Sequence, residues 1–507
     1  MGACCESVRN CADLARLEKL VKDHEKDVYA ALLKHDARIA DLVRMFNGNI
    51  QAAISTYLLR MEKEGKLEQL ITDTLLNDVL LMEHKTASII SVKEYGAVGN
   101  GVCDDTAAIK KALDHMNPGD TLRFPSGTYL MLGEVAIEKP NITLEGNGVI
   151  LCDVGFRIKS SYFKAIGLRM EALEYSTECR AFGIDNAEQN IALPTVIADF
   201  VFKDCYFKNF FYAVYAVGGS YSYDGTEEFI GYPVRDLVIE NCCSVTYTDK
   251  NAGHFQCIQV ENISYINNRT YGGKNASSYN AIKGNGFIRV IGNYDHNNSY
   301  ASCEIENGSH NIVVANNTFK SKIWIDDSRD AIVNANTADG GIHVTVGSNN
   351  GDAENVVISN NVCKNIRCER FGEYIGGIIK NVNITGNNVN GENTHGIWIS
   401  GNAVQFVMIA GNIISGVNTN DISITRNEQL DAYVRNNCGN GKPVLISGTG
   451  GAVRVVDNYK LTYSGTRDPL AASHLERAFN GVQITDESGN SWRLNVKTDG
   501  SVQTVKY

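Results

Sequence analysis

The chain has little positive charge and no long apolar run. Its 507 residues include 47 lysines and arginines against 58 aspartates and glutamates, which gives a net charge of −11. A nucleic-acid-binding protein needs a basic face, so this balance argues against nucleic acid as a partner. No stretch of roughly eighteen apolar residues is present, so we expect no membrane insertion. The first residues also lack the apolar core of a secretion signal.

Metal-binding cysteine pairs are missing as well. The 14 cysteines are scattered from Cys4 to Cys438, and no two have the Cys-x-x-Cys spacing of a zinc site. We therefore expect free thiols, no metal and no other cofactor. Proline is scarce, with seven residues, whereas 36 of the 52 asparagines lie between positions 251 and 440. Asparagine tolerates the left-handed backbone region, so this concentration indicates repeated tight turns.

A four-residue pattern recurs along this asparagine-rich region. It consists of a β-branched residue, any residue, a turn-forming residue in most copies, and asparagine. Eight copies, in steps of 19 to 26 residues, end at Asn293, Asn317, Asn336, Asn361, Asn387, Asn412, Asn437 and Asn458. The same position is filled upstream, at longer intervals, by Asn268, Cys242, Cys205 and Asn147. A regular period of this length is typical of a solenoid.

The repeats contain short alternating strands, such as Ile397-Trp-Ile and Ile422-Ser-Ile, and no helical periodicity. Short strands at this period match the coils of a single-stranded parallel β-helix, whose inward isoleucines and valines stack from coil to coil. The asparagines at the corners are expected to form a side-chain ladder. A leucine-rich repeat is the competing solenoid, but its Leu-x-x-Leu-x-Leu consensus is missing. The predicted fold class is therefore an all-β solenoid, spanning residues 89–460.

Two segments of a different kind flank the predicted solenoid. In residues 1–88, apolar residues from Leu14 to Phe46 follow three- and four-residue spacing, with His24 and His35 as polar layers of a candidate heptad seam. This α-helical region is either an ordinary hairpin or an oligomerising, coiled-coil stalk. Residues 461–507 are predicted to form a small β module with turns at 487–490 and 498–501, which would cap the solenoid or help it to trimerise.

The start of the predicted solenoid carries two distinctive motifs. The first runs Tyr95-Gly-Ala-Val-Gly-Asn-Gly-Val-Cys-Asp-Asp-Thr, where the acids suit the start of a helix, and the second is Phe124-Pro-Ser-Gly-Thr-Tyr. Together they resemble the opening of the pectate-lyase-3-like right-handed β-helix proteins, which include phage tail spikes and depolymerases. One departure is Gly99-Asn-Gly, where the family usually has Gly-Asp-Gly. The resemblance covers roughly residues 89–460 and carries over no catalytic residue.

A helical region ahead of such a β-helix is similar to the layout of a phage tail spike. The resemblance therefore implies a homotrimer in the virion tail, synthesised in the host cytoplasm. It also implies that residues 1–88 contact other tail or baseplate proteins. The partner implied for the β-helix is a bacterial surface polysaccharide.

Strand alternation predicts which side chains share one outer face of the solenoid. Residues placed outward on neighbouring coils are Glu304, Glu306, Trp324, Asp326, His343 and Trp398, while Asp327 follows a strand and can turn either way. Aromatic rings stack on sugars and paired carboxylates hydrolyse glycosidic bonds, so this face is predicted to bind and cleave a glycan. Glu306 with Asp326 is the preferred pair, at either a retaining or an inverting separation. Alternatively, the acids are only solvated and the tryptophans are covered by a loop or a subunit contact.

Further aromatic residues lie upstream. Tyr271, Tyr279 and His296 are predicted to contact the substrate, because insertions into solenoid coils usually build binding walls. Asp295, beside His296, is a further acid–base candidate. The alternative is a loop that packs on itself.

Three functions fit these features, and the fold alone does not decide among them. Glycoside hydrolysis is favoured by the predicted carboxylates. A polysaccharide lyase would need a base and a cation beside a uronic acid; Lys283 and Lys380 lie near the face, but no basic cluster is apparent. A receptor-binding or structural virion protein without catalytic activity is the third alternative.

Overall fold

The computed structural model describes most of the chain from residue 88 onward. The described ranges are 88–174, 176–177, 179–185, 196–218, 234–246, 252–279, 286–296, 300–347, 351–370, 376–391, 395–400, 403–459, 461–465, 482–485, 491–496 and 502–506. The chain divides between Thr86 and Ala87. Residues 1–87 lie outside the described part, and the helical prediction for residues 1–88 therefore falls almost entirely on them.

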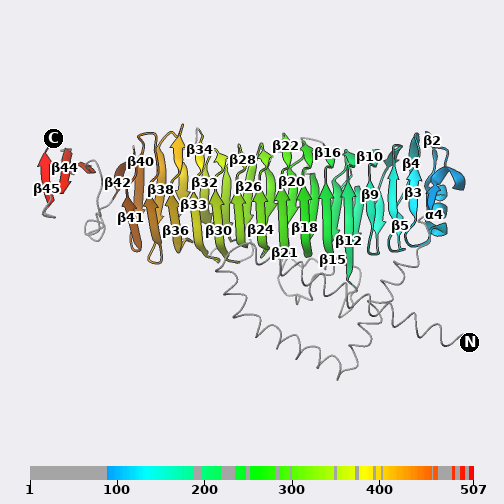
Figure 1. The fold of residues 1–507 in the computed structure, drawn as a ribbon, viewed down its shortest axis with the longest axis horizontal. Helices are drawn as coiled ribbons and strands as arrows, with labels where there is room; N and C mark the ends of the chain where they lie inside the picture. The colour runs from blue at the N-terminus through cyan, green and yellow to red at the C-terminus, as the bar shows by residue number, and fades with distance from the viewer. Residues whose placement is uncertain are drawn as a thin grey trace, which may run out of the picture. The chain divides into compact units, whose positions relative to one another are not determined.

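Three parallel sheets form the solenoid, and successive coils add strands to each of them in turn (Figure 1). Sheet A consists of β1 (Ile89–Ser91), β3 (Thr121–Phe124), β6 (Thr143–Gly146), β9 (Lys164–Ile166), β12 (Ile197–Lys203), β15 (Val234–Glu240), β18 (Val260–Ile266), β21 (Gly286–Ile291), β24 (His310–Ala315), β27 (Arg329–Asn334), β30 (Ala353–Ser359), β33 (Ile379–Thr385), β36 (Phe406–Ala410), β39 (Asp431–Arg435) and β41 (Ala452–Val456). Sheet B consists of β2 (Asn100–Asp104), β4 (Thr128–Met131), β7 (Val149–Cys152), β10 (Arg169–Ala172), β13 (Tyr206–Lys208), β16 (Cys243–Val245), β19 (Arg269–Tyr271), β22 (Tyr294–His296), β25 (Thr318–Phe319), β28 (Thr337–Ala338), β31 (Val362–Cys363), β34 (Asn388–Asn390) and β37 (Ile413–Ser415). Sheet C consists of β5 (Val135–Ile137), β8 (Phe156–Ile158), β11 (Arg180–Asp185), β14 (Tyr212–Val217), β17 (Gly253–Ile258), β20 (Asn275–Tyr279), β23 (Ala301–Ile305), β26 (Lys322–Asp326), β29 (Ile342–Val346), β32 (Ile366–Arg370), β35 (His395–Ile399), β38 (Asn420–Arg426), β40 (Pro443–Gly448) and β42 (Thr462–Gly465). The predicted right-handed parallel β-helix is confirmed.

A ladder of asparagines runs through the corner between sheets A and B. From Asn268 to Asn458, each side-chain amide donates to the side-chain oxygen of the next asparagine at 2.8–3.1 Å. Each amide also donates to a buried backbone carbonyl, as Asn361 does to Val333 at 2.9 Å. Cys205 and Cys242 occupy the same position upstream, where their thiols donate to backbone carbonyls. The predicted ladder is therefore confirmed, and it satisfies polar groups that would otherwise be buried without partners.

The residue before each ladder position explains the high asparagine content. Asn267, Asn316, Asn360 and Asn436 all have positive φ, between 53° and 57°. Glycine takes this place in other coils, as at Gly292 with φ 70°. Asparagine and glycine adopt the left-handed region at low steric cost and fill most of these corners, while Ala335 and Asp457, with φ 55° and 51°, fill two others.

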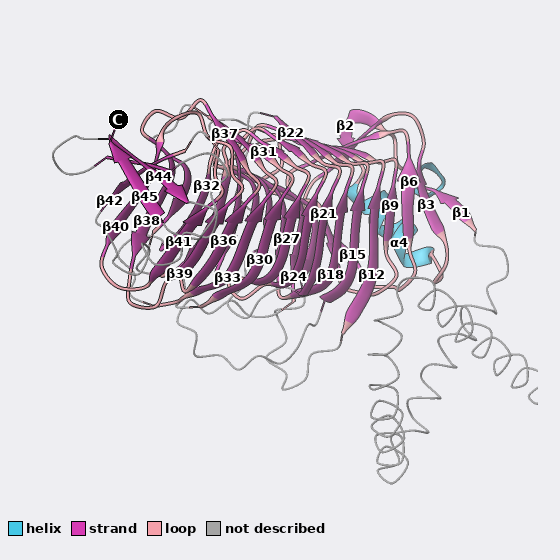
Figure 2. Cartoon of the chain, turned by 60° about the vertical axis from the view of Figure 1, so that its left-hand side comes forward, coloured by secondary structure: helices cyan, strands magenta, loops and turns pink. Residues whose placement is uncertain are grey.

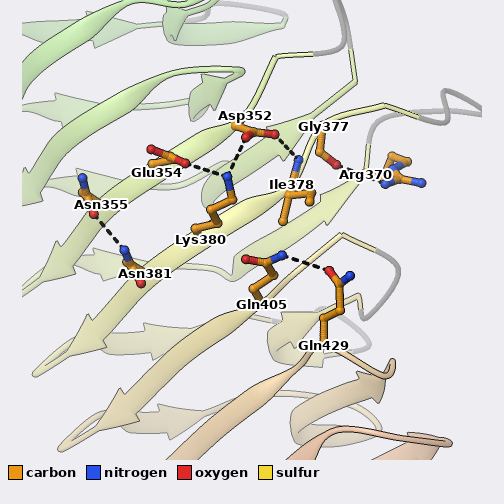
Figure 3. Close-up of polar contacts among 10 residues, drawn as sticks. All are labelled: Asp352, Glu354, Asn355, Arg370, Gly377, Ile378, Lys380, Asn381, Gln405 and Gln429. Carbon is orange, nitrogen blue, oxygen red and sulfur yellow. Dashed lines mark hydrogen bonds and ion pairs between the residues drawn. The ribbon is translucent and has the colours of Figure 1, made fainter.

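Side-chain contacts also link successive strands on the outside of sheet A (Figure 3). Lys380 Nζ lies 2.7 Å from both the Asp352 and the Glu354 carboxylates. One position further along, Asn381 donates to Asn355 at 3.0 Å. Such pairs between neighbouring parallel strands hold the coils in register.

A helix covers the N-terminal end of the solenoid, beside β3 (Figure 2). Helix α4 (Thr106–His115) buries Ile109 and Leu113 and follows the short 3-10 helix η1 (Val92–Tyr95). Its start lies where the Asp-Asp-Thr motif predicts it. Asp105 accepts hydrogen bonds from the backbone amides of Val98 and Gly99, at 2.6 and 3.1 Å, and so fixes the glycine-rich turn.

The C-terminal strands form a separate antiparallel sheet. It consists of β43 (Val482–Thr485), β44 (Ser491–Val496) and β45 (Val502–Lys506), joined in that order. The predicted turns at 487–490 and 498–501 lie outside the described residues, and β42, which the prediction included in this module, belongs to sheet C of the solenoid.

Candidate functional site

One row of outward side chains on sheet C contains most of the predicted site. Backbone pairing aligns Glu304, Trp324, His343, Arg367 and Trp398, one from each of the consecutive strands β23, β26, β29, β32 and β35. The residues beside them in each strand point into the core. The two tryptophans therefore lie on one face of the solenoid, as predicted, with a histidine and an arginine between them.

A second row on the same sheet holds the remaining carboxylates. Asp326, Thr345 and Glu369 are aligned in β26, β29 and β32. Glu306 directly follows β23, whose last residue, Ile305, pairs with Ile325, the residue before Asp326. The second row therefore begins at Glu306 and runs through Asp326 and Thr345 to Glu369.

Several of these outward groups are covered rather than exposed. Trp324 is 4% exposed, Glu304 5% and Asp326 0%. The indole N–H of Trp324 donates to the Thr345 hydroxyl at 2.6 Å, and that hydroxyl donates to the Asp326 carboxylate. Asp327 is also buried and accepts from the Gly347 amide at 2.8 Å. Of the alternatives for Trp324, the covered one is correct, and Asp326 is held in a fixed orientation.

Cations lie over the aromatic rings of this face. Lys322 Nζ is 3.9 Å from the centre of the Trp324 ring and 4.3 Å from that of Tyr300. The Tyr300 and Trp324 rings meet edge to face, 5.4 Å apart. Further along, the Arg367 guanidinium lies 5.3 Å from the centre of the half-buried Trp398 ring. These contacts make each tryptophan part of a charged and aromatic surface.

The three carboxylates nearest Tyr300 affect its ionisation. Burial raises the pKa of Tyr300 to about 12, and the negative charges of Glu304, Glu306 and Asp326 add to this effect. The Tyr300 hydroxyl therefore stays protonated at neutral pH. The same three carboxylates act on Lys322, whose pKa is nevertheless lowered because its burial outweighs their attraction.

Two further groups of this face have shifted ionisation. Burial, helped by the charges of Arg367 and Lys322, lowers the pKa of His343 to about 4, so its ring is neutral at neutral pH. His343 Nε2 lies 3.1 Å from Asn365 Oδ1, an oxygen that can only accept, so Nε2 carries the proton. Burial raises the pKa of Glu369, although Arg367 and Lys322 oppose the shift. A carboxyl of this kind is suited to donate a proton.

Sequence reasoning missed three charged residues of this site. Lys322, Arg367 and Glu369 occupy outward positions next to core isoleucines and Cys368, so alternation in Ile366-Arg-Cys-Glu could have found the latter two. The expectation that the face holds no basic cluster is corrected by Lys322 and Arg367. Lys380 lies instead on sheet A (Figure 3), and Lys283 lies outside the described residues.

Of the three upstream residues predicted to contact the substrate, two lie on sheet B and one on sheet C. Tyr271 and His296 are on the outward face of sheet B, with ring centres 6.0 Å apart. Asp295 is fully buried inside the solenoid, where it accepts hydrogen bonds from the hydroxyls of Thr270 and Ser302. Its position removes it from contact with a substrate on the outer surface. Tyr279 belongs to sheet C, and its backbone pairs with Cys257 and Ile305.

Within the described ranges, no group of three or more His, Cys, Asp or Glu side chains is arranged to hold a metal ion. No helix in that part of the chain is long and apolar enough to cross a membrane.

Comparison with known families gives a match to the N-terminal part of the solenoid. Residues 89–322 match the family described as "Rhamnogalacturonase A/epimerase, pectate lyase-like". This agrees with the resemblance in the opening motifs.

Two curated proteins are similar to short parts of the chain. Plasmin and fibronectin-binding protein A of Streptococcus pneumoniae is 34% identical over 91 residues, which are 17% of this chain and 12% of that protein. Mannuronan C5-epimerase AlgE1 of Azotobacter vinelandii is 41% identical over 59 residues, which are 11% of this chain and 4% of that protein. The chain thus spans only a small part of either relative.

Solved structures with a similar shape cover more of the chain at lower identity. The surface adhesin PfbA of Streptococcus pneumoniae aligns with a TM-score of 0.43 and 15% identity, over 75% of this chain and 100% of that one. An exopolygalacturonase from Thermotoga maritima aligns with a TM-score of 0.34 and 12% identity, over 75% and 93%.

Proposed function

We propose that the protein binds a bacterial surface polysaccharide on the outer face of sheet C and hydrolyses its glycosidic bonds. The observation that carries this proposal is the grouping of Glu304, Glu306 and Asp326 around Tyr300, beside a tryptophan row. Aromatic rings provide stacking surfaces for sugars, and paired carboxylates supply the acid and base of glycoside hydrolysis. The pectate lyase-like match supports a polysaccharide as the substrate class.

Glu369 is the proposed proton donor. Its raised pKa favours the protonated form, which can give its proton to the leaving glycosidic oxygen while water adds to the anomeric carbon. Asp326, oriented by Thr345, is the proposed carboxylate that takes the proton of that water, with Glu306 beside it. Tyr300, His343 and Trp398 are proposed to position the sugar rings, and the covered Trp324 is proposed to support Tyr300 and Thr345 from beneath.

The spacing of the strands relates the stereochemical outcome of hydrolysis to the pair of carboxylates that carries it out. Adjacent strands lie about 4.8 Å apart, so Glu306 with Asp326 suits the retaining separation of about 5 Å. Asp326 and Glu369 stand two strands apart, about 9.6 Å, nearer the inverting range of about 6.5–9.5 Å. The anomeric configuration of the first product, read by NMR, identifies the pair: inversion supports Glu369 as the acid, and retention assigns the chemistry to Glu306 and Asp326.

The test of hydrolysis compares two double variants of the full chain. Glu306→Gln with Asp326→Asn removes two carboxylates from sheet C, and the control, Asp352→Asn with Glu354→Gln, removes two from sheet A (Figure 3). Each is incubated with purified capsular or O-chain polysaccharides, and new reducing ends are measured. We expect lost turnover for the first variant and wild-type turnover for the control. Undiminished cleavage by the sheet C variant would exclude this site.

A polysaccharide lyase is the second candidate, and the basic groups of sheet C favour it. Lys322 and Arg367 flank His343, whose neutral ring can accept a proton, and Tyr300 keeps a proton to donate. A uronic acid between the two cations would be prepared for elimination. The two reactions differ in their products: a lyase leaves an unsaturated uronate that absorbs in the ultraviolet, and a hydrolase does not.

Binding without cleavage is the third candidate. The partial similarity to a protein named plasmin and fibronectin-binding protein A favours it. Retained polysaccharide binding, with neither new reducing ends nor unsaturated uronate, would identify this function.

We further propose a phage tail as the setting, with a homotrimer attached to other tail proteins through residues 1–88. The motif resemblance and the heptad spacing in those residues support this proposal. Light scattering of the intact chain tests it, with an expected mass of three times 55.5 kDa. A monomer would contradict it.

A further inference from the structure

Three rings form a cluster on the outward face of sheet B. Tyr271 of β19 and Tyr294 and His296 of β22 have ring centres 6.0–6.4 Å apart in every pairing. Tyr294 and His296 are close to parallel, at 28°. We call these three residues the tyrosine platform.

The pleat of sheet B holds the platform outside the core. Thr270 and Asp295, each flanked by outward residues in the same strand, are buried in the interior. The platform residues alternate with them and therefore project away from the solenoid. Tyr294 is 36% exposed, and Tyr271 and His296 are half-buried, so the rings support one another and still present a surface.

One arginine borders the platform, and a second lies further upstream on sheet B. Arg269 is exposed, and it pairs in register with Tyr294. Three coils upstream of β19, the Arg169 guanidinium of β10 lies 4.8 Å from the centre of the Tyr206 ring of β13. Arginine and tyrosine offer hydrogen-bond donors beside flat apolar surfaces, a combination that suits the hydroxyls and the C–H faces of sugar rings.

In the four strands that follow the platform, the row of sheet B that contains Tyr294 has no aromatic side chain. At the positions aligned with Tyr294, the following strands have Thr318, Thr337, Val362 and Asn388. The side chains at these positions have no ring, although the backbone is the same. The solenoid therefore does not need aromatic residues here for its own stacking.

We infer that the tyrosine platform is a second polysaccharide-binding surface, separate from the proposed cleavage site on sheet C. The inference rests on the proposed function for its ligand class, a glycan chain of pyranose rings. A chain held on sheet B raises the effective concentration of neighbouring segments at sheet C, so a long polysaccharide gains avidity that a short one does not.

Binding of long and short glycans tests the inference. The probes are capsular polysaccharides purified from a panel of bacteria, each used intact and as short oligosaccharides, and affinity is measured by surface plasmon resonance. Glu306→Gln with Asp326→Asn serves as the background, so that cleavage does not shorten the probe. Onto it we place Tyr271→Ala with Tyr294→Ala or, as a milder change, Tyr294→Ser alone. Thr318→Ala with Thr337→Ala is the matched control on the same sheet.

We expect the tyrosine changes to weaken the binding of an intact polysaccharide at least about tenfold, and the threonine changes to leave it unaltered. Equal affinity in the tyrosine and threonine variants would overturn the inference, as would the absence of binding to every polysaccharide of the panel. The proposed hydrolysis is read separately, from reducing ends released by the unaltered chain. Binding that depends on the tyrosines without any cleavage would retain the platform and reject the hydrolase.

Discussion

Asp295 is a carboxyl group inside the solenoid, and its replacement by asparagine gives a measurable change in stability with pH. The side chain is fully buried, with the hydroxyls of Thr270 and Ser302 as hydrogen-bond donors. Burial raises its pKa from 3.8 to about 6, although these hydrogen bonds oppose the shift. The folded protein therefore holds this proton more tightly than the unfolded chain does.

The sign of the effect follows from this difference. Because the pKa of Asp295 is raised on folding, its favourable contribution is complete below about pH 4 and is lost as pH rises through about 6. A shift of about two pKa units corresponds to about 3 kcal/mol of unfolding free energy. Asparagine has nearly the same shape, can bond both hydroxyls and never carries the charge. Asp295→Asn should therefore stabilise the protein at pH 8, by up to this amount, and leave it nearly unchanged at pH 4.

Urea unfolding of both proteins at pH 4 and pH 8, followed by circular dichroism, measures the change. Asp339→Asn is the control, since Asp339 lies on the outside of sheet B in an exposed ion pair with Lys320. It should alter the unfolding free energy by less than about 1 kcal/mol at either pH. A stability difference for Asp295→Asn that is the same at both pH values, or that favours the wild type at pH 8, would refute the reasoning.

Two other changes test the ladder and the site. Asn361→Ala removes a side chain that accepts hydrogen bonds from Asn336 at 2.9 and 3.0 Å and donates to Val333 and Asn387. We therefore expect the free energy of urea unfolding to fall by at least about 3 kcal/mol. A fall of less than about 1 kcal/mol would contradict the ladder's role. Thr345→Val removes the hydroxyl that orients Asp326, so kcat should fall about tenfold or more with little change in KM. An unchanged kcat would show that Asp326 takes no part in the reaction.

The fold could be predicted from sequence because one structural requirement recurs at every coil. The corner between sheets A and B needs a residue with a left-handed backbone conformation, followed by a side-chain amide for the ladder. Pairs such as Asn360-Asn361 meet both requirements and are visible in the sequence. The register then follows from the period. Cys205 and Cys242 fit the ladder position because a thiol can also donate to a buried carbonyl.

The candidate site was only partly predictable. Alternation places Trp324 and His343 outward correctly, because it depends on neighbouring residues alone. It does not reveal which of the three sheets a short strand joins, and so Tyr271 and His296 were not separated from sheet C. Burial depends on contacts between distant segments, which is why the 4% exposure of Trp324 has no counterpart in the sequence pattern.

A crystal structure of the Glu306→Gln, Asp326→Asn variant with a bound oligosaccharide tests the central claim most directly. The account predicts sugar rings on the outer face of sheet C, with one ring against Trp398 and a glycosidic oxygen within hydrogen-bonding distance of Glu369. An oligosaccharide bound only on sheets A or B, with sheet C empty, would contradict it.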